Sequence, residues 1–191
     1  MIMTRSYPRT KGIALTALFA TLLAIFSLVS IPIPISPVPV TLQVLIVFII
    51  VNLLGPFYGT LACAVYLLFG SIGLPVFAGG SAGPAALFGP FGGYLFAFPV
   101  SALIGGAISG RRSHSKKSDT IRVVIATSIS LIIIYLMGVI WLSESSKISV
   151  TQAFVLGAAP FIPVDVAKAF LAVPLSIYFR WSRADLPIHM R

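Results

Sequence analysis

The chain has 191 residues, of which 58% are hydrophobic and only 9% are charged. A soluble domain is normally about 25% charged, so the composition excludes an ordinary soluble domain and predicts one all-α integral membrane domain over residues 1–191. The formal net charge of +9 does not indicate nucleic-acid binding, because most basic residues flank apolar runs, at residues 5–11, 111–122 and 180–191. That distribution is typical of a membrane protein whose basic ends contact lipid phosphate.

The first predicted helix covers about residues 12–30, close to the roughly 20 apolar residues that a membrane-spanning helix needs. It ends at a proline-rich stretch, residues 31–39, where four prolines exclude a continuing helix and predict extended chain. Two shorter helices are predicted next, at about residues 40–54 and 57–69.

Residues 71–93 are apolar, yet they contain seven glycines and three prolines, so they cannot form a regular spanning helix. Irregular apolar backbone at membrane depth is expected to pack inside the protein and to line a cavity. Three further helices are predicted at about residues 94–109, 121–142 and 163–181. The expected fold is therefore a six-helix transmembrane bundle with irregular apolar external loops.

The basic segments also predict the topology. If the N-terminus is cytoplasmic, the basic loop at residues 110–120 and the C-terminal tail fall on the same side, as the positive-inside rule requires. The proline-rich stretch, the glycine-rich residues 71–93 and residues 143–162 then lie outside. We therefore expect a multi-pass protein of the cell membrane, with both termini in the cytoplasm and a ligand pocket open to the outside.

Asp165 and Lys168 lie within an apolar segment that runs from about residue 154 to 179. Charged side chains are costly at membrane depth and usually face a cavity or each other. Residues three apart share one face of a helix, so the two side chains are predicted to form a polar clamp for a ligand. The alternative is a buried ion pair that only holds helices together.

The glycine-rich loop adds candidate ligand contacts. Glycine lets a ligand approach the backbone closely, a serine hydroxyl both donates and accepts, and aromatic rings supply apolar surface. Together with a polar side chain at the start of the second helix, the candidates are Phe77, Gly79, Gly80, Ser81, Tyr94 and Gln43. The implied ligand is small and largely apolar, and it carries both donors and acceptors. Ordinary core packing and helix capping remain the alternatives for these residues.

No catalytic or metal site is expected. The single cysteine, Cys63, lies in an apolar run, and neither His114 nor His189 has a second ligand at metal spacing. A nucleophile would need a base beside it, and none is visible in the sequence. No phosphate-binding loop is present either. The chain is therefore expected not to be an enzyme, not to hydrolyse ATP itself and to need no cofactor.

Small residues recur at four-residue spacing on the first predicted helix, at Thr16, Ala20 and Ala24. Small side chains allow two helices in a membrane to approach closely. The stripe is interpreted as a docking face for another membrane protein. Packing within this chain's own bundle is the alternative.

Five motifs in one order resemble a known family. They are Val38-Pro39-Val40-Thr41-Leu42-Gln43, Leu54-Gly55-Pro56-Phe57-Tyr58-Gly59, Gly73-Leu74-Pro75-Val76-Phe77-Ala78-Gly79-Gly80, Gly89-Pro90-Phe91-Gly92-Gly93-Tyr94, and Pro160-Phe161-Ile162-Pro163-Val164-Asp165 followed by Lys168. Together they resemble the BioY family of biotin transport proteins, which are the six-helix, substrate-binding S components of energy-coupling-factor transporters. The sequence departs from the family at Ala82-Gly83-Pro84, where two glycines are common, and this departure stiffens the loop.

The resemblance implies high-affinity binding and uptake of biotin, with a transmembrane coupling subunit and an ATPase pair as partners. It implies that Asp165 and Lys168 bind biotin, that Phe77 and Tyr94 cover its thioether ring and aliphatic chain, and that the stripe around Ala20 docks on the coupling subunit. An S component for another vitamin, or a membrane scaffold with a structural Asp–Lys pair, remains the alternative.

Overall fold

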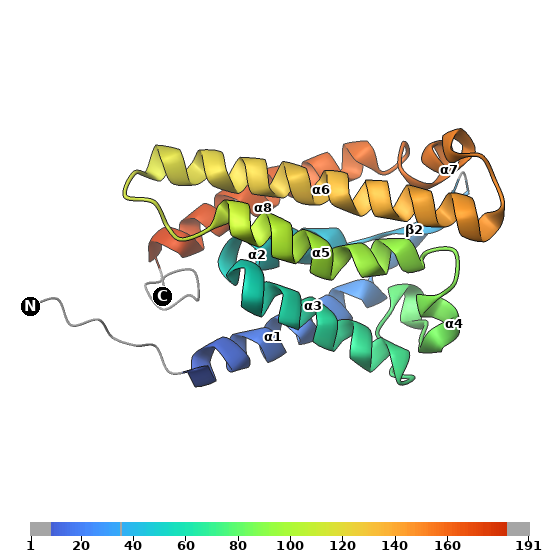
Figure 1. Ribbon diagram of the computed structural model, residues 1–191, viewed down its shortest axis with the longest axis horizontal. Helices are drawn as coiled ribbons and strands as arrows, with labels where there is room; N and C mark the ends of the chain where they lie inside the picture. The colour runs from blue at the N-terminus through green and yellow to red at the C-terminus, as the bar shows by residue number, and fades with distance from the viewer. Residues whose placement is uncertain (1–8, 35, 183–191) are drawn as a thin grey trace, which may run out of the picture.

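A computed structural model describes residues 9–34 and 36–182 of the chain (Figure 1). This part of the chain is almost entirely helical, with one short β-hairpin and one 3-10 turn. In chain order the elements are α1 (Arg9–Leu28), β1 (Ser30–Ile33), β2 (Ser36–Thr41), α2 (Gln43–Leu53), α3 (Gly55–Ser71), the 3-10 turn η1 (Ala78–Gly80), α4 (Gly83–Leu87), α5 (Gly92–Ser109), α6 (Lys116–Ser146), α7 (Val150–Gly157) and α8 (Ile162–Ser182).

The described residues form eight α-helices, so the predicted count of six is not confirmed. The six predicted helices correspond to α1, α2, α3, α5, α6 and α8, and the two additional helices are short. A proline in its first turn starts α4, and a capping box formed by Ser149 and Gln152 starts α7. The proline lets α4 begin inside residues 71–93, whose glycines and prolines otherwise predict a loop.

Within the described part of the chain, four helices, α1, α5, α6 and α8, are long and apolar enough to cross a membrane. The chain is therefore a multi-pass membrane protein. The other two apolar helices, α2 with 11 residues and α3 with 17, are shorter, and only Leu54 separates them. Gly55 follows with a φ of +70°, a conformation that glycine adopts without strain, and Pro56 then sits in the first turn of α3.

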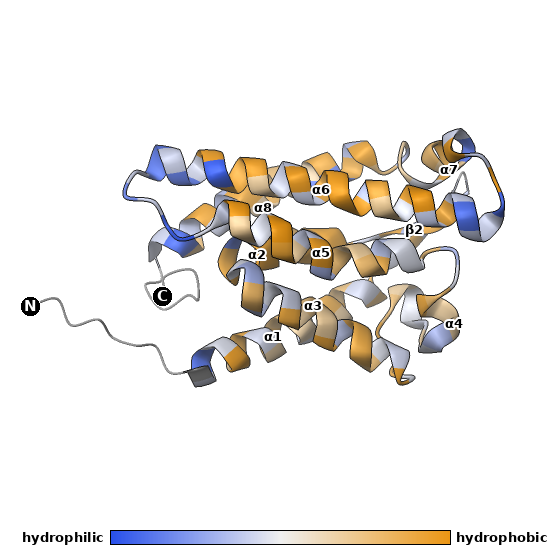
Figure 2. Ribbon diagram, viewed as in Figure 1, coloured by the Kyte–Doolittle hydropathy of each residue, from blue (hydrophilic) through white to orange (hydrophobic). Residues whose placement is uncertain are grey.

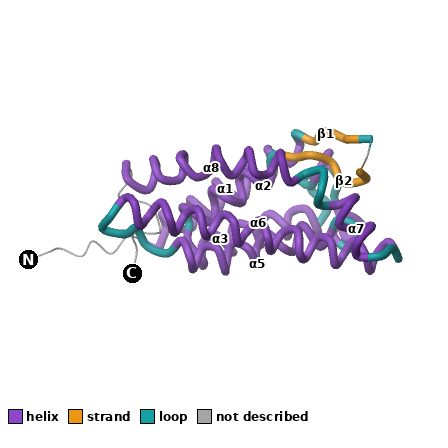
Figure 3. Tube along the Cα trace, turned by 90° about the horizontal axis from the view of Figure 1, so that it is seen from above, coloured by secondary structure: helices purple, strands orange, loops and turns teal. Residues whose placement is uncertain are grey.

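The helices run along the long axis of the molecule (Figure 1). Helix α5 packs against α6 and α3, α8 packs against α2 and α6, and α1 packs against α3. One end of the bundle holds the start of α1, the α5–α6 connection and the end of α8, whereas the hairpin, α4 and α7 gather at the other end (Figures 1 and 3). Hydrophobic residues cover the middle of the long helices, and hydrophilic residues gather near the ends (Figure 2).

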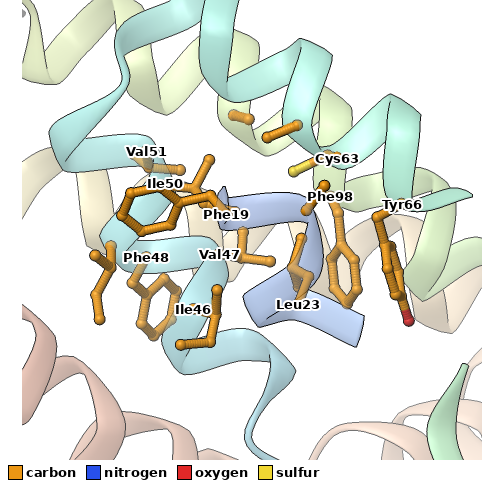
Figure 4. Close-up of a cluster of buried hydrophobic side chains, with 14 of the residues drawn as sticks. Phe19, Leu23, Ile46, Val47, Phe48, Ile50, Val51, Cys63, Tyr66 and Phe98 are labelled. Atoms are coloured by element: carbon orange, nitrogen blue, oxygen red, sulfur yellow. The ribbon is translucent and has the colours of Figure 1, made fainter. Parts of the chain in front are cut away.

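The core is centred on α2. Nine of its eleven residues are buried, and Val47, Phe48 and Ile50 are completely inaccessible. Leu23 of α1 and Tyr66 of α3 pack around this helix in the same cluster (Figure 4). A helix surrounded by protein on all sides is hydrophobic all round, and this explains how so short a helix can lie in the centre of the bundle.

The proline-rich stretch is extended, as predicted. It forms the antiparallel hairpin β1–β2, in which Ser30 pairs with Thr41 and Ile33 with Ser36. Proline lacks a backbone N–H, so a two-stranded hairpin, which leaves half of its backbone groups outside the ladder, suits this sequence. The hairpin connects α1 to α2 and lies over one end of the bundle (Figure 3).

Candidate ligand-binding site

A cavity of about 580 Å³ opens at the end of the bundle that carries the hairpin. Most of its wall is apolar, with a few polar groups contributed by β2, α2, the glycine-rich loop, α5, α6 and α8. Ligand sites in proteins usually have this size and composition, with a small number of polar groups that fix the ligand's orientation. Three segments that the sequence predicted on one side of the membrane, the proline-rich stretch, the glycine-rich residues 71–93 and residues 143–162, therefore all contribute to one cavity, together with the start of α8.

Asp165 and Lys168 both line this cavity from the first turns of α8. The Lys168 Nζ donates to Asp165 Oδ1 at 2.5 Å, and the two residues are only 6% and 4% exposed. The helical spacing of three residues brings them together, as predicted. As a unit the pair is neutral, and it places one strong donor and one strong acceptor side by side in an apolar wall.

Tyr135 of α6 belongs to the same group, and the sequence interpretation missed it. Its hydroxyl donates to Asp165 Oδ2 at 2.7 Å, and the residue lines the cavity. A signal was present in the sequence, because Tyr135 stands alone within the apolar run at residues 131–137. A buried tyrosine hydroxyl usually finds a hydrogen-bond partner, so its isolation in that run indicates a polar neighbour on another helix.

Gln43 lines the cavity, and its amide already makes two hydrogen bonds within the protein. It accepts from Thr41 Oγ1 at 2.9 Å, and its Nε2 donates to the Tyr66 hydroxyl at 2.5 Å. Gln43 is 5% exposed. One amide hydrogen and one lone pair of Oε1 are not used by these two contacts, so Gln43 can offer a ligand one donor and one acceptor position.

The residues predicted in the glycine-rich loop divide into two groups. Phe77 lines the cavity and packs edge-on against Tyr66, with ring centroids 5.5 Å apart, and Ser81 also lines it. Gly79 and Gly80 are not among the described residues of the cavity wall. They have φ angles of 65° and 79° within η1, and the Gly80 N–H already donates to the Phe77 carbonyl. These glycines therefore allow the tight turn that follows Phe77 and precedes Ser81.

Tyr94 lines the cavity from the first turn of α5. Its hydroxyl donates to the Gly157 carbonyl at 2.8 Å, which ties α5 to α7. The ring lies so close to Gly138 that a Cβ at that position would collide with it. Glycine at position 138 is therefore required for the ring to lie against α6.

The small-residue stripe on α1 faces the inside of the bundle, which corrects the docking interpretation for two of its three members. Thr16 is 4% exposed and Ala20 2%, whereas Ala24 is partly buried against the core. Their small side chains allow close packing of α1 against its own neighbours. Ala14, Ala17 and Thr21 are among the small residues that α1 exposes.

A second buried ion pair lies at the opposite end of the bundle and was also missed. Arg180 Nη2 donates to Asp119 Oδ1 at 2.7 Å, and both side chains are completely buried. The sequence interpretation assigned Arg180 to the basic flank of the last helix and Asp119 to a hydrophilic loop. Neither residue lines the cavity in the described part of the chain, so this pair belongs to the packing of that end.

Comparisons with known proteins agree with the fold and the motifs. The model of the BioY family matches residues 3–184. The probable biotin transporter BioY of Pyrococcus horikoshii is 38% identical over 165 residues, covering 86% of this chain and 93% of the relative. The biotin transporter BioY of Thermotoga maritima is 37% identical over 161 residues, covering 84% of this chain and 90% of the relative.

A solved structure is similar over nearly the whole chain. The crystal structure of the S-component for biotin from an ECF-type ABC transporter superposes with a TM-score of 0.78 at 31% sequence identity, covering 91% of this chain and 93% of that structure. The sequence, the fold and the order of the motifs therefore agree, and this chain belongs to the BioY family.

Proposed function

We propose that this chain binds biotin in the cavity and mediates its uptake as the substrate-binding S component of an energy-coupling-factor transporter. The names of its relatives and the structural match support this proposal. The observation that carries it is the buried Asp165–Lys168 pair in the wall of an otherwise apolar cavity. In this function the chain is a transport protein and not an enzyme, and biotin is its transported ligand and not a cofactor.

The pair suits the ureido ring of biotin, which presents two N–H donors and one carbonyl acceptor. The Lys168 ammonium has three hydrogens and donates one to Asp165, so two remain for the ligand carbonyl. Each carboxylate oxygen of Asp165 accepts one donor and retains acceptor capacity for a ligand N–H. The uncharged ureido group therefore matches the Asp165–Lys168 ion pair, whose two charges cancel, so that no net charge is buried when the ligand binds.

The apolar wall suits the rest of the ligand. Phe77, Phe91, Tyr94 and Phe98 line the cavity and supply surface for a thioether ring and an aliphatic chain. We assign Ser81 to the rim of the site, because it lines the cavity and is exposed. Its hydroxyl donates to the Ala78 carbonyl at 2.9 Å and retains acceptor capacity for a ligand.

The proposed topology places both termini in the cytoplasm and the cavity on the outside. The basic residues near the start of α1 and along 111–122 support this orientation, because both groups belong to the same end of the bundle, which also holds the end of α8 (Figures 1 and 2). As partners we propose membrane lipid and a transmembrane coupling subunit with an ATPase pair. Docking through α1 would use its exposed small residues Ala14, Ala17 and Thr21.

Titration of the purified protein with biotin in detergent micelles tests the proposal. We expect saturable binding. Asp165→Asn and Lys168→Met should each weaken binding by about 1.5–3 kcal/mol, as for hydrogen bonds to charged groups, which corresponds to roughly 10- to 150-fold in Kd. The double variant restores the charge balance, so its thermal stability should recover, whereas binding should not.

Glu144 and Lys147 provide a matched control, because they are also an acid and a base three residues apart and both are exposed. Glu144 lies in the last turn of α6, and Lys147 is the residue that caps its C-terminus. Glu144→Gln and Lys147→Met should leave biotin binding unchanged. A folded wild-type protein without saturable biotin binding would contradict the proposed function. A stable Asp165→Asn/Lys168→Met variant that binds biotin normally would assign the pair to helix packing alone.

A further inference from the structure

Asp165 is held from two different helices. Lys168, on the same helix, donates to Oδ1 at 2.5 Å, and Tyr135, on α6, donates to Oδ2 at 2.7 Å. The contact with Lys168 alone would leave the carboxylate free to turn about its Cβ–Cγ bond, because it engages only one oxygen. A second donor on the other oxygen, supplied from across the cavity wall, removes that freedom.

We propose that Tyr135 is a positioning residue that determines specificity for a ligand N–H, an inference that rests on the proposed function. By fixing the plane of the Asp165 carboxylate, Tyr135 aims the remaining acceptor positions of that carboxylate at the ligand. The residue is only partly buried and lines the cavity, so its hydroxyl lies at the site and not within the core.

The same hydrogen bond also supports the action of Lys168. When the ammonium turns toward a ligand carbonyl, its contact with Asp165 weakens. Without Tyr135, the buried carboxylate would then have no donor in this group, which is strongly disfavoured. The Tyr135 hydroxyl keeps a donor on Asp165 throughout. Lys168 can therefore be shared between Asp165 and the ligand. The Asp165 carboxylate then accepts from a ligand N–H, and the Lys168 ammonium donates to the adjacent ligand carbonyl.

Tyr135→Phe removes only the hydroxyl. We expect the Kd for biotin to rise about tenfold, because a carboxylate that is no longer held in the right plane loses its hydrogen bond from the ligand N–H. This value is typical of one hydrogen bond to a charged group. In an Asp165→Ala background the same substitution should change Kd by less than about twofold, because its acceptor is gone and coupled residues are not additive. A purely structural tyrosine would show the same loss in both backgrounds, which would overturn the proposal.

Two tyrosines provide matched controls. Tyr94→Phe removes a hydroxyl from the same cavity, but that hydroxyl donates to the Gly157 carbonyl, so its effect should be equal in both backgrounds. Tyr178 is 64% exposed on α8, outside the cavity wall, and Tyr178→Phe should leave Kd unchanged.

Ligand analogues provide a second readout if the Asp165→Ala variant binds too weakly to measure. Biotin methylated on one or the other ureido nitrogen loses one donor at a time. The penalty of Tyr135→Phe should disappear for the analogue whose methylated nitrogen faces Asp165 and should persist for the other. If Tyr135→Phe weakens the binding of both analogues equally, only the proposed role of Tyr135 is overturned. If the wild-type protein does not bind biotin, the proposed function is overturned.

Discussion

Arg180 is completely buried at the end of the bundle opposite the cavity, and its replacement should destabilise the fold while leaving the ligand site intact. Its guanidinium donates to both carboxylate oxygens of Asp119, at 2.7 and 2.9 Å, and to the Asn52 carbonyl at 2.7 Å. It also contacts Ser109 Oγ and the carbonyls of Ser109 and Gly110. This one side chain thus joins α2, the end of α5, the start of α6 and α8.

The cost of Arg180→Met can be worked from these contacts. Breaking a buried ion pair by removing one partner costs about 3–5 kcal/mol. Asp119 would keep two donors, the Ser113 N–H at 3.2 Å and the Trp181 Nε1 at 3.0 Å, which favours the lower end of that range. Backbone carbonyls that lose their donor add about 1 kcal/mol. We expect a total of about 4 kcal/mol, or a fall in Tm of about 8–16 °C for a chain of this size.

Thermal unfolding in detergent micelles, followed by tryptophan fluorescence, provides the measurement. The double variant Asp119→Leu/Arg180→Met should be more stable than Arg180→Met, because no unpaired buried charge remains. Arg122→Met is the matched control, since Arg122 is exposed on α6, and it should change stability by less than about 0.5 kcal/mol. Wild-type Tm in Arg180→Met, or a double variant as unstable as the sum of the two single variants, would refute the reasoning.

Two further predictions concern the membrane and the partner. Cysteines placed at Ser115 and Ser145, with Cys63 replaced by alanine, should be labelled from opposite sides of the membrane in intact cells, and labelling of both from outside would contradict the proposed topology. Ala17→Trp on the exposed face of α1 should abolish uptake through a coupling subunit but preserve biotin binding, whereas Ala20→Trp should lower the Tm because Ala20 is only 2% exposed. Normal uptake by the Ala17 variant would show that this face does not dock.

Local relations in this protein could be predicted from the sequence, because they depend only on composition and on the period of a helix. The apolar runs located the six longer helices, and the prolines located the extended hairpin. The spacing of Asp165 and Lys168 brought their side chains into contact. The motifs identified the family, which the comparisons then showed.

The faces of the helices were decided only by the tertiary structure. In a soluble helix the polar face identifies the side that faces solvent. A helix in lipid is apolar on both faces, so the sequence pattern does not distinguish its buried face from its lipid-facing one. The stripe at Thr16 and Ala20 was therefore assigned to the surface, although the structure buries it. The same ambiguity concealed the inward position of Tyr135 on α6.

Contacts between distant segments were beyond the sequence for a related reason. Tyr135 lies 30 residues from Asp165, and Asp119 lies 61 residues from Arg180. Helical periodicity fixes neighbours within a few residues, whereas these pairs depend on how α6 and α8 lie against each other. The sequence alone therefore determined which residues are polar in an apolar chain, and only the packing of the helices decided which of them meet.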